Sequence, residues 1–178
     1  TLIELLGKAL PKNTALVAED PLRLVDVGTG SGILGITAKL EYPELDVTLA
    51  DISRHALKIA EQNAKSLHTE VTLLRSDLLA NYAFVANLII ANLPYVDVSW
   101  ERSKETHHEP QDALFAADGG KALIFELLSQ TKAKLATGGT LILEADPEQH
   151  DAIIAQAKKY GLLLQDRQHY GLSFQKLR

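Results

Sequence analysis

The sequence contains no cysteine among its 178 residues, which excludes disulfide bonds and thiolate metal sites. It has no apolar run near the ~20 residues of a membrane-spanning helix, and its first residues lack the pattern of a signal peptide. Basic residues are outnumbered, since 18 Lys and Arg face 23 Asp and Glu, for a net charge of −5. This balance disfavours an extended nucleic-acid interface, which usually rests on a basic surface. We expect a monomeric cytoplasmic protein without membrane contact.

What remains is the composition of an ordinary globular domain, with 46% hydrophobic and 23% charged residues. The length suits one domain with a sizeable core, and no repeat or shift in composition divides it. We therefore treat residues 1–178 as one domain, in which residues 1–20 form an N-terminal helix and a linker.

Strand-like and helix-like segments alternate along the chain. Short β-prone apolar runs predict strands at 22–27, 47–50, 71–74, 88–91 and 140–145, and helical patterns predict helices at 1–10, 32–40, 53–66, 120–135 and 147–160. Gly138 and Gly139 predict a turn before the fifth strand. Two last strands, 162–165 and 173–177, follow without a crossover and predict a hairpin. The expected fold is α/β and Rossmann-like, a seven-stranded, mostly parallel sheet with one antiparallel strand and helices on both faces.

Residues 96–119 interrupt this pattern, because they show no periodicity and form an unusually long connection. We expect this segment to be a lid over an active site. It contains His107 and His108, which lack further ligands at metal spacing, so no metal site is expected.

A glycine-rich turn, Gly28–Gly32, joins the first expected strand to its helix. Glycines permit a tight turn and let a ligand approach the backbone closely. The spacing is G-x-G-x-G rather than the G-x-G-x-x-G of dinucleotide-binding proteins, which disfavours an NAD-dependent dehydrogenase. Taken alone, the turn could also be purely structural.

Acidic residues follow the next two expected strands. Asp51 stands where a carboxylate can accept both hydroxyls of a ribose, although it could instead cap the next helix. Asp77 stands where it can accept an adenine amino group, with Leu78 against the ring, although taken alone it could equally be a turn residue. Because the carboxyl ends of parallel strands meet at one edge of a sheet, these residues and the glycine turn predict an adenosine site.

Together these residues resemble class I methyltransferases that convert S-adenosyl-L-methionine to S-adenosyl-L-homocysteine. The resemblance implies that Asp26 and the glycine turn face the methionine part of the cofactor. The cofactor-binding residues that it implies are Asp26, Gly28, Thr29, Gly30, Gly32, Asp51, Ile52, Asp77, Leu78 and Asn92.

The segment Asn92-Leu93-Pro94-Tyr95 follows the fourth expected strand and resembles the (Asn/Asp/Ser)-Pro-Pro-(Tyr/Phe/Trp) motif of enzymes that methylate planar amino nitrogens. The side-chain oxygen of Asn92 and the carbonyl of Leu93 can accept the two N–H bonds of the acceptor nitrogen. Pro94 fixes φ, and Tyr95 can stack on the planar group. Leu93 replaces the first proline of the common motif, so its expected role belongs to its carbonyl. An ordinary turn is the alternative.

Three motifs in order, 26–32, 92–95 and the segment from Glu109 to Gly120, resemble the HemK family of protein-(glutamine amide-nitrogen) methyltransferases. These enzymes modify the Gly-Gly-Gln loop of peptide chain release factors. The resemblance implies a release factor as partner, catalytic roles for Asn92, Pro94 and Tyr95, and substrate contacts from these residues, Leu93 and Glu109. Two alternatives stay open: methylation of an adenine exocyclic amine in RNA or DNA, and a non-catalytic cofactor-binding module.

Overall fold

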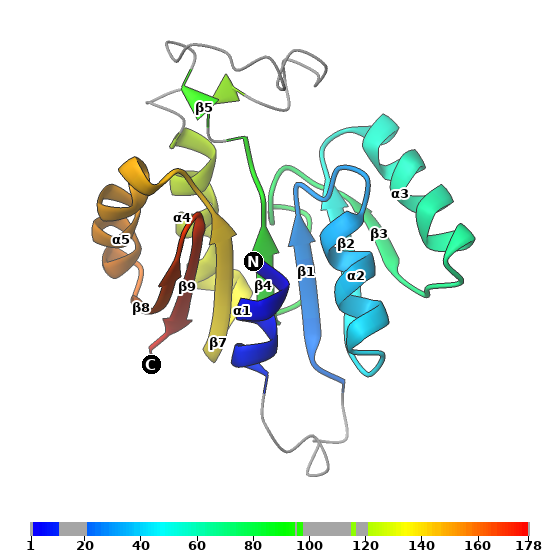
Figure 1. Ribbon diagram of the computed structural model, residues 1–178, viewed down its shortest axis with the longest axis horizontal. Helices are drawn as coiled ribbons and strands as arrows, with labels where there is room; N and C mark the ends of the chain where they lie inside the picture. The colour runs from blue at the N-terminus through cyan, green and yellow to red at the C-terminus, as the bar shows by residue number, and fades with distance from the viewer. Residues whose placement is uncertain (1, 11–20, 95, 98–114, 117–120, 178) are drawn as a thin grey trace.

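The computed structural model of the chain describes residues 2–10, 21–94, 96–97, 115–116 and 121–177. A seven-stranded sheet runs through its centre in the order β3-β2-β1-β4-β7-β9-β8 (Figure 1). Its strands are β1 (Arg23–Val27), β2 (Asp46–Asp51), β3 (Thr72–Arg75), β4 (Ala86–Ala91), β7 (Leu135–Glu144), β8 (Leu162–Gln168) and β9 (Gly171–Lys176). No helix within the described ranges is long and apolar enough to cross a membrane.

Six strands of the sheet run in the same direction, and β9 alone runs antiparallel, to both of its neighbours, β7 and β8. The predicted seven-stranded, mostly parallel sheet with a final hairpin is therefore confirmed. The parallel register aligns the ends of the strands, since Val27 at the end of β1 pairs with Ala50 in β2 and with Ala91 in β4. The loops that follow β1, β2 and β4 consequently start side by side.

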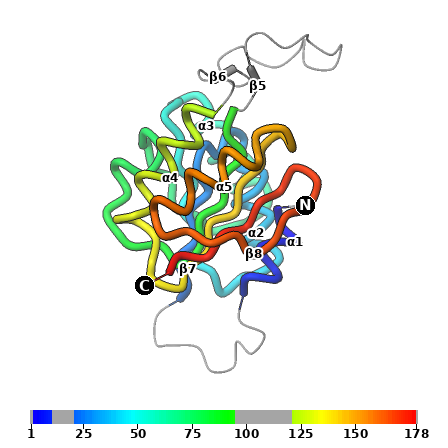
Figure 2. Tube along the Cα trace, turned by 90° about the vertical axis from the view of Figure 1, so that its left-hand side faces the viewer, coloured from blue at the N-terminus to red at the C-terminus, as the bar shows by residue number. Residues whose placement is uncertain are grey.

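Helices cover both faces of the sheet, as Figure 1 and Figure 2 show. On one face lie α1 (Leu2–Ala9), α2 (Ile33–Glu41) and α3 (Arg54–Ser66), and on the other lie α4 (Ala122–Lys134) and α5 (His150–Lys159). Successive residues of a strand point to opposite faces, so Leu24 packs in the core beneath α1–α3 and Val25 in the core beneath α4 and α5. Ser53 caps α3 by accepting a hydrogen bond from Ala56 N at 3.2 Å.

Helix α1 is an integral part of the fold. Leu5 and Leu6 are fully buried in the same core as α2 and α3, and the helix packs against β7 and β9. The fit is close, because a Cβ atom on Gly171 of β9 would lie 2.8 Å from Leu5 Cδ1. Lys8 adds an ion pair with Asp166 of β8 at 2.7 Å.

The predicted turn at Gly138 and Gly139 is wrong, because β7 begins at Leu135 and continues through both glycines. The register between β4 and β7 shifts here, between Ala86 and Leu88, and Gly138 adopts φ of +76°. A Cβ atom on Gly139 would lie 2.8 Å from the Asn87 carbonyl oxygen, so only glycine allows this approach. Gly138 and Gly139 therefore form an irregularity within β7, and they do not form a turn that precedes the strand.

Two further expectations are refined by the structure. The helix expected from Pro147 begins with the 3-10 turn η4 (Pro147–Gln149), capped by Asp146, and continues as α5. Of the segment 96–119, the structure describes β5 (Val96–Asp97) and β6 (Phe115–Ala116), which pair in parallel. The predicted lid otherwise lies outside the described residues.

Candidate active site

The loop Gly28–Gly32 connects β1 to α2 and is held from several sides. Its glycines at 28, 30 and 32 have φ of +69°, +55° and +85°, which is the left-handed region that favours glycine. The backbone N–H groups of Gly28 and Thr29 both donate to the Ala50 carbonyl, at 2.9 and 3.0 Å. The loop is thereby attached to the end of the neighbouring strand β2.

Asp26 lies buried beneath this loop. Its Oδ2 accepts hydrogen bonds from the Thr29 hydroxyl at 2.6 Å and from Gly35 N in the first turn of α2 at 2.9 Å. Burial raises the pKa of Asp26 from 3.8 to about 6, against the lowering effect of these two donors, and the charge of Asp51 raises it further. The carboxyl group therefore ties the loop to the helix that follows it.

Asp51 ends β2 directly beside the loop. Its Oδ2 accepts a hydrogen bond from Gly30 N at 2.9 Å and its Oδ1 accepts one from Ser53 N at 2.8 Å. Each carboxylate oxygen can accept a second bond, and the side chain is only partly buried. Asp51 can therefore hold the loop and still receive the hydroxyls of a ligand. The neighbouring Ile52 side chain is 61% exposed, which leaves an apolar surface at this end of the sheet.

Asp77 and Leu78 follow β3 at the same edge, where Ser76 N donates to the Asp51 carbonyl at 3.0 Å. Asp77 is exposed, whereas the Leu78 side chain is buried and its backbone has φ of +48°. A bulky residue in this region is strained, and such strain gathers at functional sites. Gln130 on α4 holds the next residue, since its Oε1 accepts a hydrogen bond from Leu79 N at 2.7 Å.

The segment after β4 lies against the glycine loop. Asn92 is exposed and Pro94 is half-buried, while Leu93 is 4% exposed and belongs to the core beneath α4 and α5. A Cβ atom on Gly28 would lie 2.7 Å from Leu93 Cδ2, so the Leu93 side chain fills the space beside the loop. Tyr95 lies outside the described residues.

The structure thus brings most of the sequence-predicted residues to one edge of the sheet, at the ends of β1, β2, β3 and β4. Glu109 and the two lid histidines lie outside the described ranges. Among the described residues, no group of three His, Cys, Asp or Glu side chains could hold a metal ion. Sequence reasoning missed Gln130, because nothing in a helical pattern marks one polar residue as the partner of a loop 51 residues away.

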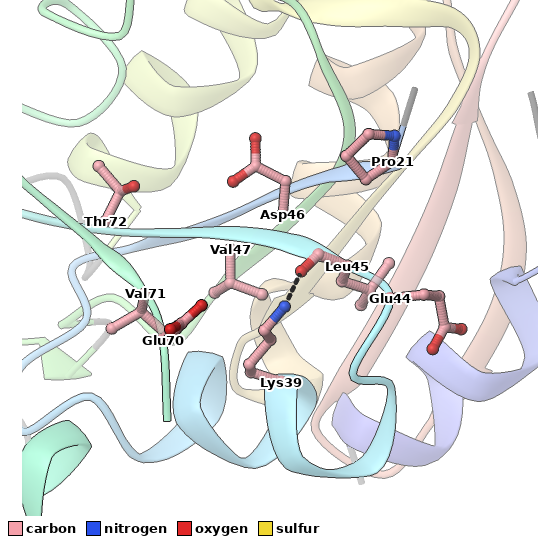
Figure 3. A pocket seen from close by; sticks show the side chains of 9 residues that line it. All are labelled: Pro21, Lys39, Glu44, Leu45, Asp46, Val47, Glu70, Val71 and Thr72. Carbon is pink, nitrogen blue, oxygen red and sulfur yellow. Dashed lines mark hydrogen bonds between the residues drawn. The ribbon is translucent and has the colours of Figure 1, made fainter. Parts of the chain in front are cut away.

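A hollow of about 400 Å³ lies at the opposite end of the sheet, where β2 and β3 begin (Figure 3). Its lining includes the carboxylates of Glu44, Asp46 and Glu70. The ammonium group of Lys39, also in the lining, donates to the carbonyls of Pro43 and Leu45 at 2.6 Å each. This hollow contains none of the predicted site residues and is separate from the loop edge.

Residues 4–112 match the methyltransferase small domain family. The chain is 34% identical over 141 residues to the release factor glutamine methyltransferase of Deinococcus radiodurans, covering 78% of this chain and 51% of the relative. It is 33% identical over 184 residues to the protein of the same name from Coxiella burnetii, covering 97% and 61%. The resemblance predicted from the three motifs is confirmed, and the chain spans about half the length of the Deinococcus relative.

Solved structures support the fold. The 16S rRNA N2 G1207 methyltransferase of Thermus thermophilus, in complex with AdoMet and guanosine, superposes with a TM-score of 0.68 at 15% sequence identity. The match covers 99% of this chain and 43% of that chain. At this identity the likeness concerns the fold alone.

Proposed function

Because the chain belongs to the methyltransferase small domain family, we propose that it methylates the side-chain amide nitrogen of glutamine in the Gly-Gly-Gln motif of a peptide chain release factor. The methyl donor in this proposal is S-adenosyl-L-methionine. The observation that carries it is the packing of the Asn92–Pro94 segment on the glycine loop, through Leu93 and Gly28. The names of the Deinococcus and Coxiella relatives favour the glutamine substrate.

The described residues fit the proposed cofactor. A Cβ atom on Gly30 would have no neighbour within 4 Å, so open space adjoins the loop there. Asp51 has acceptor capacity left for ribose hydroxyls beside that space, and the exposed Ile52 offers an apolar surface for a purine. When bound, S-adenosylmethionine would supply an electrophilic methyl group.

The residues after β4 would orient the acceptor. A glutamine amide is a poor nucleophile because its lone pair is delocalised, so its nitrogen must be positioned accurately. The Asn92 side-chain oxygen and the Leu93 carbonyl would accept its two N–H bonds. These two groups lie beside the glycine loop because Val27, the last residue of β1, pairs with Ala91, the last residue of β4. The loops that follow β1 and β4 therefore begin next to each other. Positioning of this kind can contribute up to ~7–11 kcal/mol in favourable cases.

The remaining parts of the proposal concern residues beyond the described ranges and the setting of the protein. Residues 1–178 would form one catalytic domain, with residues 96–119 as a lid that brings Glu109 to the pocket and Tyr95 as an aromatic wall for the amide. The protein would act as a monomer in the cytoplasm, where release factors are found at work on the ribosome.

Mass spectrometry tests this function directly. The chain is incubated with purified release factor and S-adenosylmethionine, and the peptide that contains Gly-Gly-Gln is sequenced. We expect one added methyl group on the glutamine, and none on a release factor in which that glutamine is replaced by alanine. An unmodified glutamine, with a folded chain that binds S-adenosylhomocysteine, would overturn the proposed substrate. Methylated adenine in an RNA supplied in parallel would instead support the nucleic-acid alternative.

A further inference from the structure

Helix α3 contacts the glycine loop at two points on one of its faces. Asn63 Nδ2 donates a hydrogen bond to the Ser31 carbonyl at 2.9 Å. Three residues earlier, Ala60 is fully buried against the loop, since a Cβ atom on Gly32 would lie 3.2 Å from the Ala60 Cβ. Residues three apart share a helix face, so both contacts belong to one docked surface.

The bond from Asn63 fixes the peptide unit between Ser31 and Gly32 at its carbonyl. The other end of the same peptide unit, Gly32 N–H, donates to the Thr29 carbonyl at 2.9 Å. This unit lies between two left-handed glycines, Gly30 and Gly32, whose backbones have many accessible conformations when nothing holds them. Asn63 therefore holds this part of the loop by a hydrogen bond from outside it, as Asp51 holds Gly30.

We propose that Asn63 is a positioning residue for the methyl donor. It holds the Gly30–Gly32 part of the loop in the conformation that receives the methionine end of S-adenosylmethionine. A loop that is already ordered loses less conformational entropy on binding, so the restraint acts on affinity. The inference rests on the part of the proposed function that assigns the cofactor to this loop, and it does not depend on which acceptor is methylated.

If Asn63 had a purely structural role, loss of its hydrogen bond would lower the stability of the unliganded chain. The proposal predicts the opposite pattern. The hydrogen bond is exposed, and exposed bonds contribute little to folding because water replaces them. Loss of the bond should therefore leave the stability of the unliganded chain nearly unchanged, while the affinity for the cofactor falls.

The test uses Asn63→Ala, which removes the side-chain amide, and Asn63→Asp, which keeps the shape and removes the donor. Gln62→Ala is the matched control, because Gln62 is an exposed neighbour on the same helix. Binding of S-adenosylhomocysteine is measured by calorimetry, and stability by urea unfolding without ligand. We expect both Asn63 variants to bind about five- to tenfold more weakly, with unfolding midpoints close to that of the parent chain and of Gln62→Ala.

Two results would overturn the proposal: Asn63→Asp that binds as tightly as the parent, or a loss of affinity that Gln62→Ala shares. A parent chain that fails to bind S-adenosylhomocysteine would overturn both this inference and the cofactor assignment. A parent chain that binds it without methylating a release factor would leave Asn63 in its role and contradict only the proposed substrate.

Discussion

Leu93 and Gly28 are in direct contact across the gap between the loops that follow β4 and β1, because a Cβ atom on Gly28 would lie 2.7 Å from Leu93 Cδ2. One of these residues belongs to the proposed acceptor clamp and the other to the proposed cofactor loop. The spacing between the proposed acceptor clamp and the proposed cofactor loop is therefore set by the Leu93 side chain, which packs against Gly28, a residue without a side chain.

Replacing Gly28 by Ala should disturb this contact. The new methyl group meets Leu93, and the backbone φ of +69° is unfavourable for alanine. Gly30→Ala is the matched control, since it has φ of +55° and no neighbour within 4 Å. The backbone strain costs ~1–2 kcal/mol in both variants, and overpacking adds ~1–3 kcal/mol only at Gly28. Urea unfolding should show this difference, and equal losses would contradict the contact.

Leu93→Ala should destabilise the chain by roughly 2–4 kcal/mol, since it removes a buried side chain from the core beneath α4 and α5. Combined with Gly28→Ala, the loss should be smaller than the sum of the two single losses, because the clash disappears with the leucine. A double-mutant cycle by urea unfolding measures this coupling. Strict additivity would show that Leu93 and Gly28 act independently.

Asn92→Ala should slow methyl transfer about 5- to 100-fold. This is the range expected when one N–H group of the substrate glutamine amide loses its hydrogen-bond acceptor. Asn92 is exposed, so the stability of the unliganded chain should not change. Asn92→Asp keeps an acceptor oxygen and should lose less activity. Initial rates with release factor, set beside calorimetry, check both variants. An unaffected rate in Asn92→Ala would contradict the proposed role of Asn92 in orienting the acceptor nitrogen.

Asp26 should make stability depend on pH. Its pKa is 3.8 when exposed and about 6 in the folded chain. Between these two values the folded chain holds a proton that the unfolded chain has released, so the contribution of Asp26 to the unfolding free energy declines as pH rises through this window. Above the folded pKa the buried carboxylate costs up to roughly 3 kcal/mol.

Asp26→Asn removes this titration and keeps an oxygen acceptor for the Thr29 hydroxyl. The difference in unfolding free energy between variant and parent should shift in favour of the variant by a few kcal/mol between about pH 4 and pH 7. Urea unfolding at several pH values measures the difference, in which titrating groups that do not interact with Asp26 cancel. Parallel pH profiles would show that the pKa of Asp26 is not raised.

Sequence periodicity predicted the sheet well because strand and helix periods are local properties of the chain. The position of Asp51 at the carboxyl end of its strand, and of Asn92 after the fourth, followed from that alternation, since parallel strands end at one edge. Ser53 was recognisable as a cap from its own chemistry.

Features that depend on distant partners were missed. Gly138 and Gly139 suggest a turn locally, but the approach of Gly139 to the Asn87 carbonyl decides that the strand continues. The Leu93 side chain gave no sign of its contact with Gly28, and the sequence assigned it a role through its carbonyl alone. Asn63 and Gln130 have the appearance of solvent-facing helix residues until the loops that they hold are seen.

The place of β9 in the sheet has a consequence for how the protein is made. This strand is the last of the seven to leave the ribosome, yet it lies between β7 and β8, and its Phe174 is fully buried. Until residues 171–176 have emerged, β7 has an unpaired edge and α1 lacks one of the strands against which it packs. The nascent chain can assemble its first parallel strands early, but it completes the sheet, and the last of the contacts of its first helix, only when synthesis has passed residue 176.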